Sequence, residues 1–356
     1  MIQNIQFENF RGFRKMTLSD LRPVTLISGK NNVGKSSILE GIFLFFDHIS
    51  PDSFMKISQF RGGTFPLHTV SLWETFFYKM DADNPLRLSV TYNGENASLE
   101  YKKDNSYIPA NDYNVPMDVM NQFISYAKSA YTLKFSYHKG QYSENGHFSI
   151  GTQGMIRNAT SSLENNQFEN FPLIRFINAT VIMSDSTLID WVGKLELQGN
   201  KDKIIEMLKY MDPSISDICT ISMDGRVQLY IRSDKNLIPL KLAGDGVNKL
   251  LYIILAIIES PNSVILIDEV ETGFHYSMYK NLWEVIGRVA QKYHCQIIAT
   301  THSYECIVGA SEGMKQIGLS EDFCYYRIER NEQENIAYRF SNDVLQTALS
   351  VDIEVR

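Results

Sequence analysis

Eight residues near the start of the chain combine glycines, a lysine and a hydroxyl at the spacing used to bind polyphosphates. Residues 29–36 read Gly-Lys-Asn-Asn-Val-Gly-Lys-Ser and match the pattern G-x-x-x-x-G-K-[ST]. Bare N–H groups at the start of a helix attract anions, and glycines let the backbone curl around them. Lys35 is suited to contact the β- and γ-phosphates, and the Ser36 hydroxyl is suited to bind Mg²⁺. The predicted phosphate-binding residues are Gly29, Asn31, Asn32, Gly34, Lys35, Ser36 and Ser37.

The segments on either side of this loop have the patterns that the motif requires. Residues 24–28 form a short apolar run that is typical of a buried strand, and residues 36–46 have the spacing of a helix. A strand, a glycine-rich loop and a helix in this order predict that the chain binds a nucleotide.

A second candidate site element is an apolar strand that ends in two carboxylates. Residues 264–267 are Val-Ile-Leu-Ile, and Asp268 and Glu269 follow them directly. Ligands of open α/β sheets bind at the carboxyl ends of the strands. We expect Asp268 to hold Mg²⁺, directly or through water, and Glu269 to orient or deprotonate the attacking water. Because strands often end in acids, this prediction depends on the phosphate loop upstream.

A third apolar strand, residues 295–301, also runs into polar residues and brings a histidine, His302. A histidine at this edge can contact the γ-phosphate or the attacking water. The alternative is a histidine that only caps the following helix. Because the glycine-rich loop and the Asp268–Glu269 strand are also present, the sequence favours the catalytic role for His302.

Composition and charge limit the number of domains, the cellular compartment and the partners that we expect for this protein. With 44% hydrophobic residues in 356, the chain can bury the core of one large domain or two modest ones. The four cysteines lack metal-site spacing and are typical of a reducing cytosol. The start lacks the features of a signal peptide and no apolar run could span a bilayer, so we expect a cytoplasmic protein without membrane contact. The net charge of −7 argues against general nucleic-acid binding but allows a local basic groove.

The order of the predicted strands and helices indicates an α/β domain interrupted by an insertion. Residues 1–48 and 171–356 alternate strands with helices, which favours a mostly parallel sheet covered by helices on both faces, with an N-terminal β lobe. Residues 49–170 read as an inserted α+β region with antiparallel strands, one or two helices and a mobile loop. Within the insertion, residues 140–169 are poor in aliphatic side chains. We expect the insertion to be the partner-binding surface.

Together the three elements resemble the ABC-type ATPases of the SMC, RecF and OLD group. Residues 5–13, Ile-Gln-Phe-Glu-Asn-Phe-Arg-Gly-Phe, are similar to the opening strand of that group, and the resemblance implies that Arg11 lies close to the nucleotide. Residues 268–275, Asp-Glu-Val-Glu-Thr-Gly-Phe-His, are similar to the Asp-Glu-Pro-Glu-x-x-Leu-His stretch of OLD-like ATPases. Val270 replaces the usual proline and Phe274 the leucine. His302 matches the switch histidine.

Two further positions follow from the same resemblance. Residues 243–249 stand where the ABC signature, which reaches across a dimer to the other subunit's γ-phosphate, is expected. The usual Ser-Gly-Gly core is absent, but Gly244 and Gly246 offer N–H groups at a helix start and Lys249 offers a positive charge. An ordinary glycine-rich helix start is an equal alternative. The resemblance also implies a glutamine lid residue that contacts Mg²⁺. Gln59 is a candidate for it, by its position in the sequence alone.

The resemblance implies an ATPase that needs ATP and Mg²⁺ and dimerises head to tail around two ATP molecules. Stand-alone relatives are often the sensor and motor of bacterial anti-phage systems, in which a separate nuclease or toxin acts. The alternatives are a RecF-like repair ATPase that clamps DNA, and a scaffold that binds ATP without turnover. No heptad pattern predicts coiled-coil arms, and the stretch after His302 is too short for the Toprim nuclease of OLD proteins.

Overall fold

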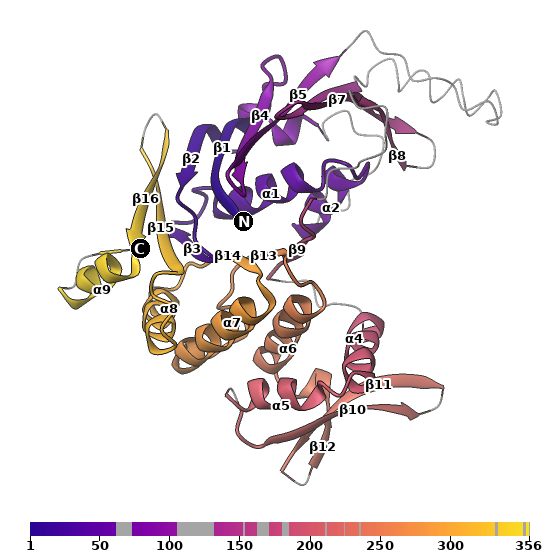
Figure 1. Cartoon of the computed structure of the whole chain (residues 1–356), viewed down its shortest axis with the longest axis vertical. Helices are drawn as coiled ribbons and strands as arrows, with labels where there is room; N and C mark the ends of the chain where they lie inside the picture. The colour runs from indigo at the N-terminus through magenta and orange to yellow at the C-terminus, as the bar shows by residue number, and fades with distance from the viewer. Residues whose placement is uncertain are drawn as a thin grey trace. The chain divides into compact units, whose positions relative to one another are not determined.

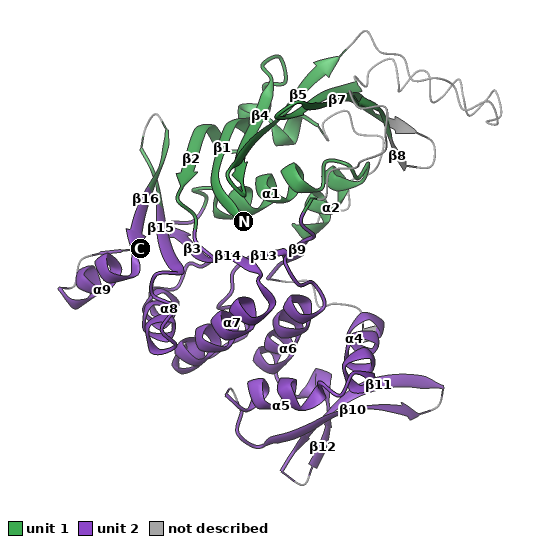
Figure 2. Cartoon of the chain, in the orientation of Figure 1, with its two compact units in different colours: residues 1–21, 32–171, 328–337 green, residues 22–31, 172–327, 338–356 purple. Residues whose placement is uncertain are grey.

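The computed structural model of the chain divides into two compact units, each built from several stretches of sequence (Figures 1 and 2). Unit 1 contains residues 1–21, 32–171 and 328–337, and unit 2 contains residues 22–31, 172–327 and 338–356. The residues that the structure describes are 1–61, 73–104, 132–151, 154–161, 171–179, 185–210, 212–223, 225–234, 236–331, 334–351 and 354–355.

Unit 1 is built on a seven-stranded antiparallel sheet in the order β2-β1-β4-β5-β6-β7-β8. Along β4, the apolar Leu86, Leu88 and Val90 are buried and alternate with exposed Arg87 and Ser89, which is typical of a sheet with one covered face. The strands are β1 (Ile2–Phe10), β2 (Phe13–Ser19), β4 (Leu86–Tyr92), β5 (Glu95–Asp104), β6 (Thr132–Lys139), β7 (Tyr142–Gly151) and β8 (Gly154–Ser161).

Two helices of unit 1, α1 (Lys35–Phe46) and α2 (Ser53–Phe60), contact each other, and α1 also contacts β1. Helix α1 is buried from Ser37 to its end. Because such a helix is apolar nearly all round, its stability comes from packing rather than from one amphipathic face. The helix predicted over residues 36–46 is confirmed.

The N-terminal strands and the strands of the insertion form one continuous sheet, because β1 pairs with β2 on one side and with β4 on the other. The compact unit that holds the insertion therefore also holds residues 1–21 and 32–48. Residues 142–151 and 154–161, which lie in the stretch with few aliphatic side chains, pair antiparallel as β7 and β8. The hydrogen bonds between their backbones stabilise these strands although the sequence lacks a regular apolar alternation.

Unit 2 is built on a six-stranded sheet in the order β16-β15-β3-β14-β13-β9, in which β3, β14, β13 and β9 run parallel. Every residue of β3, β13 and β14 is buried, as expected for parallel strands covered on both faces. The predicted α/β class is confirmed. The strands are β3 (Val24–Gly29), β9 (Ile174–Ile177), β13 (Val264–Ile267), β14 (Gln296–Thr300), β15 (Phe323–Arg330) and β16 (Asn335–Ser341).

The helices of the parallel sheet alternate with its strands along the chain, and α6, α7 and α8 lie along the sheet in Figure 1. Their apolar faces join one core, in which Trp283, Leu282 and Ile254 are completely buried. The helices are α6 (Asp245–Ile258), α7 (Tyr279–Tyr293), α8 (Tyr304–Gln316) and α9 (Asn342–Ser350).

A small α/β element of unit 2 precedes α6 and carries two helices and a three-stranded sheet in the order β10-β11-β12. β10 and β11 are neighbours in the sequence and pair antiparallel. In the described part of the chain, no helix is long and apolar enough to cross a bilayer. The elements are α4 (Asp185–Leu197), α5 (Lys201–Lys209), β10 (Ile215–Met223), β11 (Arg226–Ser233) and β12 (Asn236–Pro239).

Candidate active site

The parallel register of unit 2 brings three predicted site segments to one edge of the sheet. Ile267 of β13 pairs with Ala299 of β14, and Thr300 of β14 pairs with Ile27 of β3. Asp268 follows β13, and residues 301–302 follow β14. Gly29 ends β3, and residues 30–31 of the glycine-rich loop follow it. This edge is the carboxyl end of the strands, where open α/β sheets bind their ligands.

Thr300 fixes the Asp268 carboxylate and the backbone of Glu269 after β13. Its hydroxyl donates to Oδ1 of Asp268 and accepts the backbone N–H of Glu269 at 2.9 Å. Glu269 has φ +46°, a left-handed conformation that is uncommon outside glycine and asparagine. The strained backbone and its hydrogen bond turn the chain immediately after Asp268. The carboxylate of Asp268 and the hydroxyl of Ser36 are oxygen ligands of the kind that Mg²⁺ prefers, together with phosphate oxygens.

His302 is fixed by Glu271, a residue that the sequence reasoning quoted within a motif but did not assign. Oε1 of Glu271 lies 2.7 Å from Nδ1 of His302 and accepts the backbone N–H of His302, also at 2.7 Å. Ser303, and not His302, caps helix α8, since its hydroxyl accepts the N–H of Cys306. Half of the His302 side chain is exposed, with 54% accessible, whereas Glu271 is 5% accessible.

The segment predicted to act as a signature packs against the turn after β13 within unit 2. Nζ of Lys249 donates to the backbone carbonyl of Glu269 at 2.7 Å. Burial lowers the pKa of Lys249 to about 8, and the negative charges of Glu271, Glu269 and Asp268 oppose this. A Cβ on Gly246 would lie 2.8 Å from the carbonyl of Gly273, so only glycine fits there. Lys249 thus contacts the carboxylate turn of its own chain.

Gly244 stands at the N-cap of α6 with φ +94°, a conformation that favours glycine, and it is exposed. Its carbonyl accepts the side-chain amide of Asn248 at 3.0 Å and also the Asn248 backbone N–H at 3.2 Å. The glycine therefore opens the helix with its N-terminal backbone near solvent. A trans role for Gly244, Gly246 and Lys249 stays a prediction.

The second half of the glycine-rich loop belongs to unit 1, where it enters α1. Gly34 has φ +97°, and a Cβ there would lie 2.5 Å from the Phe13 ring. The carbonyl of Val33 accepts the side-chain amide of Asn335 at 2.8 Å. Lys35 and Ser36 open α1 and are half-buried. Close packing of an aromatic ring against Gly34 explains why this position of the loop requires glycine.

Arg11 lies in a buried ionic cluster of unit 1. Its Nε lies 3.0 Å from Oε2 of Glu40, its Nη1 donates to the carbonyl of Thr75 at 2.9 Å, and its guanidinium stacks on Phe76 at 4.0 Å. Arg61 binds the same carboxylate: its Nε pairs with Oε1 and its Nη2 donates to Oε2 at 3.0 Å. Glu40 is therefore held by two arginines. The predicted proximity of Arg11 to a nucleotide stays a prediction.

Gln59 is exposed near the end of α2, two residues before Arg61. Its role as a lid also stays a prediction. Sequence reasoning missed Glu40, Arg61 and Thr300 because no short motif marks their partners, which lie 21 to 32 residues away in the sequence. The signal that could have found Glu271 was its place two residues after Glu269.

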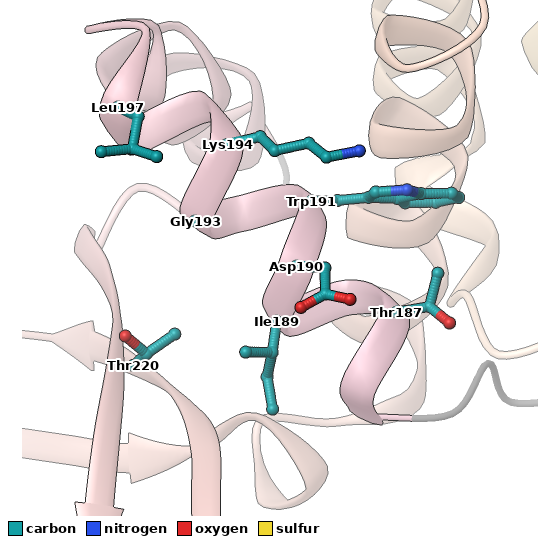
Figure 3. A pocket seen from close by; sticks show the side chains of 8 residues that line it. All are labelled: Thr187, Ile189, Asp190, Trp191, Gly193, Lys194, Leu197 and Thr220. Carbon is teal, nitrogen blue, oxygen red and sulfur yellow. The ribbon is translucent and has the colours of Figure 1, made fainter.

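A pocket of about 460 Å³ lies elsewhere in unit 2, between α4 and β10 (Figure 3). Asp190, Trp191 and Lys194 line it from α4, and Thr220 lines it from β10. None of the predicted site residues lines this pocket, so we do not assign nucleotide chemistry to it.

The sequence model of a family described as AAA ATPase domain matches residues 1–307. An ATP/GTP phosphatase of Helicobacter pylori is 25% identical over 379 residues, which cover 96% of this chain and 99% of that protein. An uncharacterized protein of Methanocaldococcus jannaschii is 35% identical over 116 residues, 30% of this chain and 48% of that protein.

Solved structures with a similar fold are heads of SMC proteins. The SMC head bound to the C-winged helix domain of ScpA has a TM-score of 0.55 at 11% identity, over 98% of this chain and 99% of that one. The Smc head with an extended coiled coil, bound to the C-terminal domain of ScpA from Pyrococcus furiosus, has a TM-score of 0.50 at 10% identity. That match covers 100% of this chain and 99% of the other. At these identities the likeness concerns the fold alone.

Proposed function

The chain belongs to the AAA ATPase domain family and is an ATPase, and from this premise we propose that it works as an ATP-driven homodimer that controls a separate effector. The observation that carries the proposed site is the meeting of residues 29–31, Asp268 and His302 at the carboxyl ends of three neighbouring parallel strands. A phosphate loop alone would bind nucleotide. Carboxylates and a histidine at the same edge supply groups for hydrolysis.

The predicted residues at this edge would divide phosphate binding, Mg²⁺ binding and hydrolysis between them. Gly29, Asn31, Asn32, Gly34 and Ser37 surround the phosphates, and Lys35 neutralises the β- and γ-oxygens. Asp268 and Ser36 would hold Mg²⁺, which supplies charge stabilisation on the phosphates. Glu269 accepts a proton from the attacking water, and His302 contacts the γ-phosphate or that water.

The dimer would complete each site with the segment from Gly244 to Lys249 of the other subunit. The start of α6 supports this, because an exposed glycine leaves backbone N–H groups accessible to an anion. Lys249 also contacts Glu269 of its own chain. When this segment binds the nucleotide of the other subunit, it would therefore also shift Asp268 and Glu269 of its own subunit. ATP binding would close the dimer and hydrolysis would open it.

The output of this cycle would come from another protein. The site residues above serve ATP hydrolysis, and we assign no second reaction to the described residues. We place the chain as the sensor and motor subunit of a bacterial anti-phage system, in the cytoplasm, with a nuclease or toxin as effector and residues 49–170 as the partner-binding surface. The alternative is a RecF-like ATPase that clamps DNA. The SMC-head fold favours neither alternative, since it is shared by the whole group.

Substitutions in the proposed site test its two halves separately. Lys35→Ala should abolish ATP binding, because the main phosphate-neutralising charge is lost. Glu269→Gln should bind ATP normally but lose turnover by about 10²- to 10⁴-fold, the contribution typical of a general base, and should accumulate as an ATP-bound dimer. ATP affinity, phosphate release and the mass by light scattering are the measurements. Retained ATP binding in Lys35→Ala would remove the assigned site, and unchanged turnover in Glu269→Gln would remove Glu269 as the base.

A pull-down of the tagged protein from cells that carry its native operon tests the effector. We expect a neighbouring gene product with nuclease or toxin chemistry to co-purify. Deleting residues 49–170 would remove β4 to β8 from the sheet that holds β1 and β2, so exposed side chains are substituted instead. Lys102→Glu and Lys134→Glu, at exposed positions on the paired strands β5 and β6, should weaken that association, and Lys209→Glu on α5 of unit 2 is the control. Binding that is unchanged by the first two substitutions would place the partner surface elsewhere.

A further inference from the structure

Glu271 is a buried carboxylate that none of the roles above uses, and it lies directly against His302. Both contacts of its Oε1, to the backbone N–H and to Nδ1 of His302, measure 2.7 Å. The other oxygen, Oε2, is buried and accepts no hydrogen bond from the described residues. Burying a carboxylate in this way costs free energy that packing alone does not repay. A buried group left partly unsatisfied calls for a functional explanation.

The contact with Glu271 determines which nitrogen of the imidazole carries hydrogen. An ionised carboxylate only accepts hydrogen bonds, so Nδ1 must be the donor. Nε2 lies on the opposite side of the ring and therefore points away from Glu271. In the neutral ring Nε2 accepts a hydrogen bond, and in the protonated ring it donates one. Half of the His302 side chain is exposed, so the ring is accessible to a ligand.

The charge of Glu271 is also balanced from a second element. The attraction of Glu271 is the largest of the effects that oppose the burial of the Lys249 ammonium on α6. Lys249 in turn donates to the carbonyl of Glu269. Glu271 thus contacts the histidine after β14 and attracts the lysine of the helix that carries the signature segment. A shift of either neighbour would change the field at the carboxylate.

We propose that Glu271 is a positioning residue for His302, which holds the ring by Nδ1 and its backbone so that Nε2 is presented to the γ-phosphate or the attacking water. The inference deepens the proposed function, since it rests on the role given there to His302. Orientation of a histidine by a carboxylate is how a general base or electrostatic group is kept in its productive geometry. Glu271 acts here only through His302.

A double-mutant cycle of Glu271→Gln and His302→Ala tests the inference. Gln is close to Glu in size but carries no charge, so its amide oxygen accepts the same two N–H groups only in weaker, uncharged hydrogen bonds. Its amide NH₂ can also turn toward Nδ1 and favour the other tautomer of the ring. We expect Glu271→Gln to lower kcat about 10- to 100-fold with little change in ATP affinity. In the His302→Ala background, Glu271→Gln should cause no further loss. Glu284→Gln, at a buried carboxylate on α7, is the matched control and should leave kcat unchanged.

The outcomes separate this inference from the proposed function. If His302→Ala lowers kcat and Glu271→Gln does not, Glu271 is not a positioning residue and the role of His302 stands. If the two losses multiply in the double variant, Glu271 acts independently of His302 and the inference is wrong. If His302→Ala leaves kcat unchanged, the role of His302 itself is wrong, and the inference falls with it.

Imidazole ¹⁵N NMR gives a readout that needs neither turnover nor the folding of a variant at Glu271. At a pH of about 9, well above the ordinary histidine pKa of about 6.5, the His302 ring should carry its hydrogen on Nδ1. The signals are assigned by their loss in His302→Ala. A wild-type ring that carries its hydrogen on Nε2 would overturn the inference.

Discussion

At the scale of residues, His48 of unit 1 shows how burial links pH to stability. The side chain is fully buried, its Nδ1 lies 2.6 Å from the carbonyl of Phe45, and its ring stacks on Tyr137 with centroids 4.6 Å apart. Burial lowers the pKa of His48 to about 4, and the charge of Arg157 adds to this. Because the folded state holds the proton less tightly than the unfolded state, acid favours unfolding.

The free energy of unfolding should therefore fall as pH drops from about 6.5 to about 4, by about 3 kcal/mol from this group alone. His48→Phe should flatten the pH dependence of the melting temperature in that window, since phenylalanine does not titrate. His138→Gln, at an exposed histidine on β6, is the control and should leave the slope unchanged. Equal slopes for wild type and His48→Phe would contradict the assignment.

At the scale of elements, the ionic cluster on Glu40 joins three segments of unit 1. Glu40 lies on α1, Arg61 follows α2, and Arg11 lies between β1 and β2. The carboxylate is 1% accessible, Arg11 is 12% accessible and Arg61 is 49% accessible. Arg61 also donates to the hydroxyl of Ser37 at 3.3 Å. The cluster therefore ties the helix that begins with Lys35 to the helix that carries Gln59.

Glu40→Ala should destabilise unit 1 by about 3 to 5 kcal/mol, because it leaves the buried guanidinium of Arg11 without its partner. Arg61→Ala should cost much less, since Arg61 is half exposed and Arg11 keeps the carboxylate paired. Urea unfolding of both variants measures the difference. A cost for Arg61→Ala equal to that of Glu40→Ala would show that the two arginines contribute alike.

At the scale of the whole molecule, the charge of −7 bears on the choice between the proposed function and a DNA clamp. Proteins that grip duplex DNA through phosphates lose affinity steeply with salt. We expect the ATP-bound Glu269→Gln variant to show no ATP-dependent binding to duplex DNA between about 50 and about 200 mM salt. Fluorescence anisotropy of a labelled duplex measures this. Binding that requires ATP and weakens steeply across that range would favour the RecF-like alternative.

The sequence by itself determined the chemistry and the class of fold. The glycine-rich loop, the Asp268–Glu269 pair and His302 each follow a short apolar strand, and strand periodicity and motif spacing are local properties that can be read from neighbouring residues. The predicted ATPase is confirmed by the AAA ATPase domain match over residues 1–307, and the predicted class of fold by its likeness to SMC heads.

Only the tertiary structure decided which strands pair and which side chains contact the predicted site residues. It joined β1 and β2 to the strands of the insertion in one sheet, and it paired residues 142–151 with residues 154–161 as β7 and β8. It placed Glu271 against His302 and two arginines on Glu40, pairs separated by 21 to 31 residues in the chain. Such contacts depend on strand order and helix packing, which are set by the burial of the whole chain and leave no local pattern in the sequence.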